Sequence, residues 1–235
     1  MEVEQLTDWL WCLRTPVVQA YAVRQGDGFN LIDTSTAGNE DAILEALGGS
    51  AIHEIVLTHG HEDHMGSAAK LVERTGARVL APAVEIPFIQ GEQPMPPPQL
   101  LEWEKPFLEQ VSPNVPKAPP VHVDVALEEG TTLNWDRPAA VVAAPGHTPG
   151  SIALLFEEEK VLVAGDAIAS HEGEPMVGVF NCDPPLAVQT FRRLAELDVE
   201  IACFGHGDPV RSDARAKLAR VSARHAPGHE SIEQP

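Results

Sequence analysis

Three histidines and one aspartate lie within six residues of one another, directly after the apolar run Ile55-Val56-Leu57. They are His59, His61, Asp63 and His64. This feature restricts the fold most, because four metal-binding side chains in so short a loop must face the same region of space. His59 and His61 can reach one ion from an extended loop, whereas Asp63 and His64 at the next turn point toward a second. The segment therefore predicts a strand, a loop and a helix that together hold part of a two-ion site.

Three later apolar runs end in a similar way, at a polar residue next to a glycine. The runs 141–146, 161–165 and 201–205 lead to His147, Asp166 and His206, respectively. Glycine allows a tight turn, so each strand end can present its polar side chain at one rim of the molecule. We therefore expect these three side chains to converge with the first cluster.

Short apolar runs alternate with turn residues and with a few amphipathic stretches, which predicts mixed α and β structure rather than a helical bundle. The expected strands, most of them rich in β-branched residues, are 17–23, 29–33, 54–58, 79–81, 141–144, 151–156, 161–164 and 201–204. The expected helices are 40–47, 67–75, 186–197 and 212–224, the last with Ser212 as its N-cap. We expect a single domain over residues 1–235.

The segment from Pro82 to Pro120 interrupts this alternation, because it contains 11 of the 21 prolines. Proline at this density is incompatible with central regular structure, so the segment is expected to be an insertion on the surface. It is either a passive connection or an ordered wall beside a substrate site. Its aromatic residues Phe88, Trp103 and Phe107 favour the wall and are the expected substrate-pocket residues.

Charge and cysteine content restrict the partners and the cellular compartment of the chain. Lys and Arg number 16 and Asp and Glu 35, which gives a net charge of −19, so the chain should repel nucleic acids. The three cysteines form no CxxC pair and are too few for a disulfide framework, which indicates a reducing compartment. Neither a signal peptide nor an apolar run of about 18 residues is present. We expect a soluble cytoplasmic protein that binds neither nucleic acid nor membranes.

With these residues in view, the chain resembles the metallo-β-lactamase-fold hydrolase superfamily over nearly its whole length. The resemblance rests on the motif HxHxDH at 59–64, followed in order by PGHTPGS, AGD and GHG. It implies an α+β fold, a four-layer αββα sandwich of two mixed β-sheets flanked by helices, with the metal site at one edge. It further implies that His59, His61 and His147 hold one metal ion, that Asp63, His64 and His206 hold a second, and that Asp166 bridges the two.

Imidazole and carboxylate ligands suit two divalent ions, with zinc expected and manganese or iron as alternatives. The resemblance implies that a hydroxide shared by the two ions is the nucleophile, with Asp63 and Asp166 as the catalytic carboxylates. Asp63 would orient the hydroxide and transfer its proton. Asp33, which also ends an apolar run, corresponds in the family to a carboxylate near the ligands. It either orients a histidine or is an ordinary turn or N-cap residue.

The activity that follows is hydrolysis of small esters, thioesters or lactones, in a stand-alone enzyme similar to glyoxalase II or to lactonases. Its expected partner is a small-molecule acyl substrate, and a homodimer is compatible with it. The chain after His206 is too short for the helical domain with which glyoxalase II binds glutathione, and no tyrosine lies between Asp166 and His206, where acyl-homoserine lactonases have one. Class B β-lactamases lack an aspartate at the position of Asp166.

Two other functions remain open from the sequence. A mononuclear iron dioxygenase acting on a persulfide would leave Asp63, His64 and His206 without an ion to bind. A binding protein that uses metal only for stability would be expected to close its coordination shell with protein ligands.

Overall fold

Along the central strands, neighbouring apolar side chains point into two different cores. The computed structural model describes residues 1–225 of the chain. In it, Ile32 and Val56 belong to one core, whereas Leu31 and Ile55, each adjacent in sequence, belong to another. Successive side chains of a strand point to opposite faces of its sheet, so a strand that is apolar throughout must be covered on both sides. These runs therefore require a layered fold.

The first sheet contains seven strands in the spatial order β1 to β7. The first four pair antiparallel, whereas β4, β5, β6 and β7 pair parallel, so the sheet is mixed. The strands are β1 (Glu2–Gln5), β2 (Leu10–Arg14), β3 (Gln19–Gln25), β4 (Gly28–Ile32), β5 (Ile52–Val56), β6 (Arg78–Pro82) and β7 (Val125–Leu127).

The second sheet contains five strands in the order β14-β11-β10-β9-β8, and only β11 and β14 pair parallel. Its strands are β8 (Thr132–Leu133), β9 (Ala139–Ala143), β10 (Ile152–Phe156), β11 (Val161–Val163) and β14 (Ile201–Cys203). A separate antiparallel pair, β12 (Ile168–His171) and β13 (Glu174–Val177), follows β11 after one short 3-10 segment. The core between the two sheets includes Trp9 and Phe156, whose ring centroids are 4.9 Å apart.

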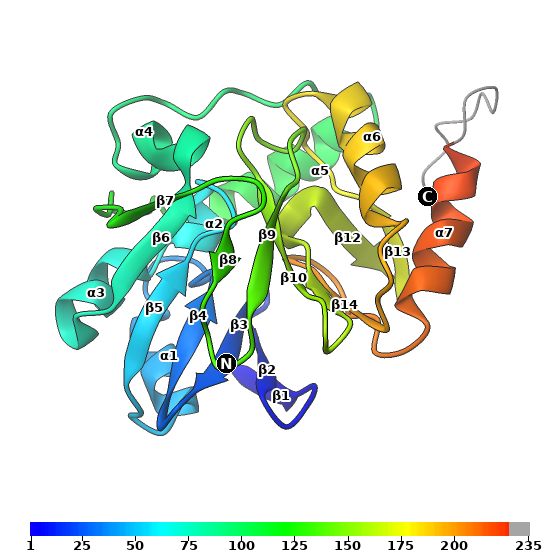
Figure 1. The fold of residues 1–235 in the computed structure, drawn as a ribbon. Helices are drawn as coiled ribbons and strands as arrows, with labels where there is room; N and C mark the ends of the chain where they lie inside the picture. Colours follow the sequence, from blue (N-terminus) through cyan, green and yellow to red (C-terminus); the bar gives the residue numbers. More distant parts are fainter. Residues whose placement is uncertain (226–235) are drawn as a thin grey trace.

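Helices cover the outer face of each sheet (Figure 1). Ile43 of α1 and Leu71 of α3 pack on the first sheet, and Phe191 of α6 and Leu218 of α7 pack on the second. The α-helices are α1 (Glu40–Ala46), α2 (Glu62–Met65), α3 (Ala68–Thr75), α4 (Ile86–Ile89), α5 (Glu104–Val111), α6 (Pro184–Leu194) and α7 (Ala214–Arg224), and the short 3-10 segments are η1 (Ala83–Glu85), η2 (Ser112–Asn114) and η3 (Gly165–Ala167). This arrangement confirms the predicted four-layer αββα sandwich.

The predicted N-cap of the last helix, Ser212, is wrong by one residue. The N-cap of α7 is Asp213, which lies in the left-handed region at φ 56° and makes no side-chain capping bond. The first N–H groups of this helix are instead satisfied by the backbone just before β14, because Ala214 N donates to Glu200 O (3.1 Å) and Arg215 N to Val199 O (2.9 Å). A side-chain cap is therefore unnecessary.

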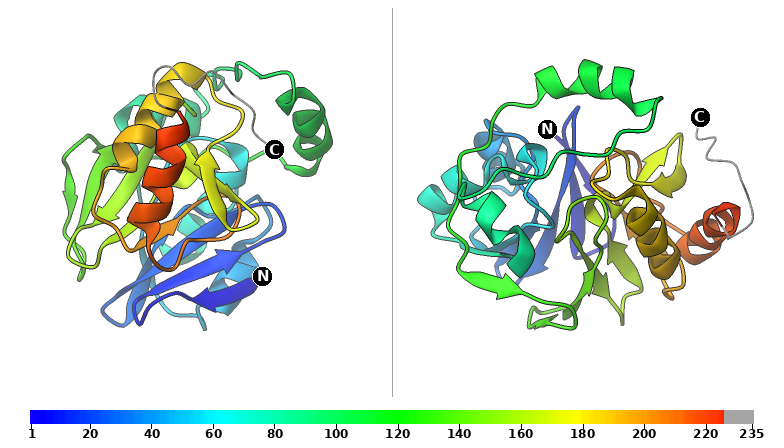
Figure 2. Two further views of the ribbon diagram at one scale, coloured as in Figure 1. Left: turned by 90° about the vertical axis from the view of Figure 1, so that its right-hand side faces the viewer. Right: turned by 90° about the horizontal axis from the view of Figure 1, so that it is seen from above.

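The Pro82 to Pro120 insertion leaves the sheets after β6 and returns to them at β7. The insertion is not irregular throughout, because it contains the helices α4 and α5. Pro87 and Pro106 lie in the first turns of these helices, where the missing N–H costs no intrahelical hydrogen bond. Seen from above, α5 lies outside both sheets, to one side of them (Figure 2). None of the helices within residues 1–225 is both long and apolar enough to span a bilayer.

Candidate metal centre and active site

The donors from the first sheet follow the carboxyl end of β5. His59 and His61 lie in the loop between β5 and α2, and Asp63 and His64 lie within α2. His59 and His64 are fully buried, whereas His61 and Asp63 are partly exposed. The predicted strand, loop and helix are thus present.

The second sheet contributes donors from three different strand ends. His147 lies in the loop between β9 and β10, Asp166 lies in η3 after β11, and His206 follows β14. The turn before His206 depends on a glycine, because a Cβ atom on Gly205 would collide with Asp166 Oδ1 and with His64 Cε1, which lies 2.6 Å away. Glycine therefore allows strand β14 to end in close contact with the other donors.

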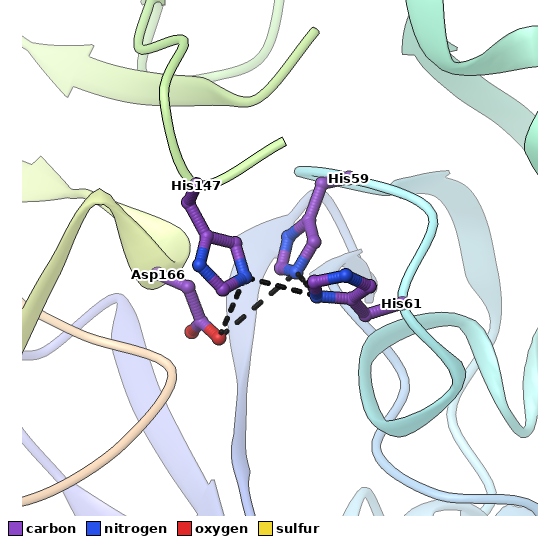
Figure 3. A group of neighbouring side chains, drawn as sticks. All are labelled: His59, His61, His147 and Asp166. Atoms are coloured by element: carbon purple, nitrogen blue, oxygen red, sulfur yellow. Dashed lines mark hydrogen bonds and ion pairs between the residues drawn. The ribbon is translucent and has the colours of Figure 1, made fainter. Parts of the chain in front are cut away.

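Four side chains converge in a first cluster (Figure 3), namely His59, His61, His147 and Asp166. His61 Nδ1 lies 3.1 Å from His59 Nε2 and 2.9 Å from His147 Nε2. Asp166 Oδ2 lies 3.4 Å from His147 Nε2 and 4.0 Å from His59 Nε2. Ligand atoms that share one tetrahedral zinc ion at about 2.0–2.1 Å lie about 3.3 Å apart, so these separations match a single ion.

Asp63, His64 and His206 form a second cluster beside the first. His206 Nε2 lies 3.4 Å from Asp63 Oδ2. Asp166 faces this cluster with both oxygens, because its Oδ1 lies 3.2 Å from His64 Nε2 and its Oδ2 lies 3.2 Å from His206 Nε2. Asp166 therefore lies between the two clusters, at the position expected of a bridging carboxylate.

Hydrogen bonds on the far side of three imidazoles fix which nitrogen faces the cluster. The Nδ1 atoms of His147 and His206 lie 3.0 Å from Val179 O and 2.9 Å from Val17 O. His59 Nδ1 lies 3.0 Å from the Thr58 hydroxyl oxygen. With Nδ1 as the donor in each case, Nε2 is the nitrogen that faces the cluster, and in the neutral ring its lone pair can bind a metal ion.

Asp33 is buried next to these residues and organises the inner side of the site. Its Oδ2 accepts a hydrogen bond from the Thr58 hydroxyl (2.8 Å) and lies 2.8 Å from His64 Nδ1, while its Oδ1 accepts from Thr58 N (2.8 Å). Asp33 does not cap a helix, because the N-cap of α1 is Asn39. The contact of Asp33 with His64 matches the first of its two expected roles, a carboxylate that orients a histidine.

The electrostatics divide the histidines into two groups. Burial, reinforced by neighbouring imidazoles, lowers the pKa of His59 far below its usual range, and burial together with His147 lowers the pKa of His61 to about 3. Burial also lowers the pKa of His147. These three rings are therefore neutral, which is the form that binds metal ions.

The other two histidines face carboxylates and behave in the opposite way. Burial disfavours their charged forms, but Asp166 outweighs it and raises the pKa of His206 to about 10, and Asp166 with Asp33 raises the pKa of His64. Burial likewise opposes ionisation of Asp166, yet His206 and His64 lower its pKa. The buried carboxylates thus create a place for positive charge.

Unsatisfied buried atoms show that this donor set fits metal ions. His64 Nε2 and Asp166 Oδ1 are buried and face each other at 3.2 Å, but neither makes a well-aligned hydrogen bond to any residue within 1–225. Buried polar atoms normally have partners, and cations among these atoms would supply them. Cations would also relieve the mutual repulsion of the three neutral imidazole nitrogens of the first cluster. The two donor clusters, linked by Asp166, are consistent with a dinuclear centre.

A cavity of about 1180 Å³ opens onto both clusters. His61, Asp63, His147, Asp166 and His206 line one part of it. The Pro82 to Pro120 insertion lines another part and contributes all three predicted pocket residues, Phe88, Trp103 and Phe107. Phe107 remains 42% exposed and packs against Phe180, with ring centroids 5.4 Å apart.

Sequence reasoning missed Glu85, a fully buried carboxylate behind the site. Glu85 Oε2 accepts a hydrogen bond from Gly60 N (3.0 Å), and Oε1 accepts from Thr148 Oγ1 (2.9 Å) and Gly150 N (2.7 Å). Burial raises the pKa of Glu85, while these three donors favour its ionised form. Glu85 thereby joins the loop of His59 and His61 to the loop of His147. The only sequence signal was an isolated acidic residue in the apolar stretch 83–86.

Sequence comparison places these residues in a known family. The model of the metallo-beta-lactamase superfamily matches residues 14–206. The chain is 31% identical over 196 residues to the probable metallo-hydrolase YflN of Bacillus subtilis (strain 168), a match that covers 74% of each protein. It is 28% identical over 242 residues to the hydroxyacylglutathione hydrolase of Ectopseudomonas mendocina (strain ymp), covering 96% of this chain and 76% of that protein.

Solved structures agree with this relationship. A metallo-beta-lactamase family protein from Thermus thermophilus superimposes with a TM-score of 0.69 at 25% identity, over 94% of this chain and 80% of its own. The di-iron-bound form of the protein TTHA1623 superimposes with a TM-score of 0.64 at 28% identity, over 91% of this chain and 96% of its own. The chain belongs to the metallo-beta-lactamase superfamily, and its paired clusters of histidine and aspartate are those of a metallo-hydrolase.

Proposed function

We propose that this protein hydrolyses small esters, thioesters or lactones with the help of two divalent metal ions, zinc being the expected metal and manganese or iron the alternatives. One observation supports this most directly: two donor clusters share Asp166 and line the same cavity. The thioester is included because the chain is similar to proteins named hydroxyacylglutathione hydrolase. The reaction adds water across the acyl bond: an ester gives a carboxylic acid and an alcohol, a thioester gives a carboxylic acid and a thiol, and a lactone gives a single hydroxy acid.

The proposed assignment gives each residue a position in the centre. His59, His61 and His147 would hold one ion, Asp63, His64 and His206 the other, and Asp166 would contact both. Divalent ions at such a site polarise a carbonyl oxygen and lower the pKa of water. Asp33 and Glu85 hold the loops that carry these donors through the hydrogen bonds described above.

Asp63 is the residue best placed to handle a proton. Its side chain is 16% exposed and lines the cavity. Asp33, in contrast, is buried, and its oxygens contact Thr58 and His64. A carboxylate that faces substrate and solvent can accept a proton from water and pass it to the leaving group. The apolar remainder of the cavity would exclude bulk water around the reacting bond.

The metal content of the purified protein, measured together with turnover of esters, thioesters, lactones and persulfides, tests the proposal. We expect close to two ions per chain and hydrolysis in at least one of the first three classes. About one ion per chain with oxygen uptake on a persulfide would support the mononuclear iron dioxygenase instead. Full metal content without turnover on any class would support a metal-stabilised binding protein.

Two variants sharpen this test. His61→Ala should lose an ion and most of the activity, whereas His53→Ala, a histidine with a 42% exposed side chain at the other end of β5, should change neither. Asp63→Asn keeps an oxygen of similar size but removes the base, so kcat should fall by roughly 10²–10⁴-fold while part of the metal is retained. Full activity of Asp63→Asn at full occupancy would assign the proton transfer to another group.

A further inference from the structure

We propose that the acyl substrate is uncharged and mainly apolar, and that the cavity discriminates against esters and thioesters with an anionic group away from the reacting bond. This inference rests on the proposed hydrolase function and adds to it the chemical class of the substrate. It comes from the composition and the fixed position of the cavity wall that faces the donors.

The wall contributed by the insertion is built mainly from proline, methionine, aromatic and aliphatic side chains, and its polar members Gln93, Ser112 and Asn114 are uncharged. Its members include Phe88, Met95, Trp103, Leu108, Val111 and Val115. Within the part of the chain that the structure describes, no lysine or arginine lines the cavity. Outside the donor clusters the titratable lining residues are Glu62 and His171, and both are exposed to solvent.

The positively charged side chains of the insertion do not enter the cavity. The insertion has two lysines, Lys105 and Lys117, and neither lines the cavity. Lys105 is paired on the exposed surface with Glu102, at 2.6 Å. A carboxylate or phosphate on a bound acyl group would therefore lose water without gaining a positive partner, which is costly. The net charge of −19 adds long-range repulsion of anions.

The wall is tied to the body of the protein, so it cannot easily rearrange to supply a cation. The buried Glu104 accepts hydrogen bonds from Leu101 N (2.8 Å) and, across the cavity wall, from Phe180 N (2.9 Å). Gln99 N donates to Asn181 O (2.8 Å). At the metal centre itself, Met95 Cε would lie only 2.9 Å from a Cβ atom on Gly60, so this methionine is packed directly on the loop of His59 and His61.

A matched pair of substrates tests the charge discrimination. p-Nitrophenyl octanoate and the mono-p-nitrophenyl ester of suberic acid share the leaving group and the chain length, but only the suberate ester carries a terminal carboxylate. At pH 8.5, kcat/KM should be at least about 30-fold higher for the octanoate. Equal values for the two esters would overturn the inference.

A variant that places a cation in the wall gives an independent test. Leu108 lines the cavity, whereas Gln110 lies two residues further along α5, is exposed and does not line it. Leu108→Arg should raise kcat/KM for the suberate ester relative to the octanoate by at least about 10-fold. The control Gln110→Arg adds the same charge to the same helix and should leave this ratio unchanged. An equal effect of the two variants would point to the overall charge rather than the wall and would contradict the proposal.

The same assay separates this inference from the proposed function. p-Nitrophenyl acetate reports ester hydrolysis without a long acyl chain. If the acetate is cleaved in a metal-dependent way but the suberate ester matches the octanoate, the hydrolase function stands and the substrate class is wrong. If no ester, thioester or lactone is cleaved by the metal-loaded protein, the proposed function itself fails.

Discussion

At the scale of single residues, the metal donors could be predicted from the sequence, whereas the carboxylates that hold them were harder to find. The donors stand out because three histidines and Asp63 follow one apolar run, and because His147, Asp166 and His206 each end another. The role of Glu85 depends on partners 25, 63 and 65 positions away in the sequence, which no local pattern reveals. Asp33 was recognised as a candidate, but only its contacts with Thr58 and His64 distinguish the two readings.

Replacing Asp33 by asparagine tests its role in orienting His64. The two oxygens of Asp33 together contact Thr58 N, the Thr58 hydroxyl and His64 Nδ1. An asparagine has only one side-chain oxygen, so it cannot accept hydrogen bonds from all three groups. The affinity for the second ion should fall by about 10- to 100-fold, the usual effect of losing a carboxylate that supports a ligand. Competition with a chromophoric chelator measures this affinity. Asp27→Asn, at a side chain that is 98% exposed, is the control, and an unchanged affinity in Asp33→Asn would exclude the role.

Glu85→Gln should weaken the hydrogen bonds that connect the loop of His59 and His61 to the loop of His147. The amide nitrogen of glutamine must face Gly60 N–H or the donors of Thr148 and Gly150, which leaves a buried donor unpaired. The loss should be about 1–3 kcal/mol of unfolding free energy, with weaker binding of the first ion. Denaturant unfolding and metal titration measure the two effects. Glu102→Gln on the exposed surface is the matched control. If Glu85→Gln changed the unfolding free energy and the metal affinity no more than this control, the hydrogen bonds of Glu85 would not support the donor loops.

At the scale of elements, sequence patterns predicted most of the buried strands but missed the peripheral ones and also β2, although Leu10, Cys12 and Leu13 of β2 are buried. Strands such as β10 and β11 are buried throughout and are therefore continuous apolar runs in the sequence. The edge strand β1 is mostly exposed, and β8 has only two residues, so neither has a recognisable pattern. Helix α5 was missed because it lies among prolines, and its packing against the rest of the site depends on the buried Glu104 and on Phe180.

The Pro82 to Pro120 insertion yields a prediction about chain length. If it forms the wall of the acyl site, Trp103→Ala should raise KM for octanoyl esters more than for acetyl esters, because only the longer chain reaches the wall. Metal content should not change. Lys105→Ala, on the same insertion but outside the cavity lining, serves as the control. Steady-state kinetics over a series of acyl lengths measures the effect, and equal changes at all lengths would identify the insertion as a passive connection.

At the scale of the whole molecule, the candidate metal centre joins the two sheets at one edge of the sandwich. His59, His61, Asp63 and His64 come from the first sheet, whereas the other three donors come from the second. Away from this edge the sheets are held by the apolar core around Trp9 and Phe156. Close to it, protein contacts already connect them, since Phe204 N donates to the buried Tyr21 hydroxyl at 3.0 Å.

Removing the metal should therefore loosen one edge rather than unfold the protein. Ions that bind only the folded state stabilise it by about 4 kcal/mol when their concentration is about 1,000 times Kd, so chelation should lower Tm and restored zinc should recover it. Hydrogen exchange should rise in the loops 59–61, 147–150 and 205–207, because buried carboxylates are left without their cations. The amides of β10 should stay protected, since its side chains belong to the apolar cores on both faces of the second sheet. An unchanged Tm would argue against a bound metal that links the sheets, and a loss of protection throughout β10 would show that the centre is needed for the whole fold.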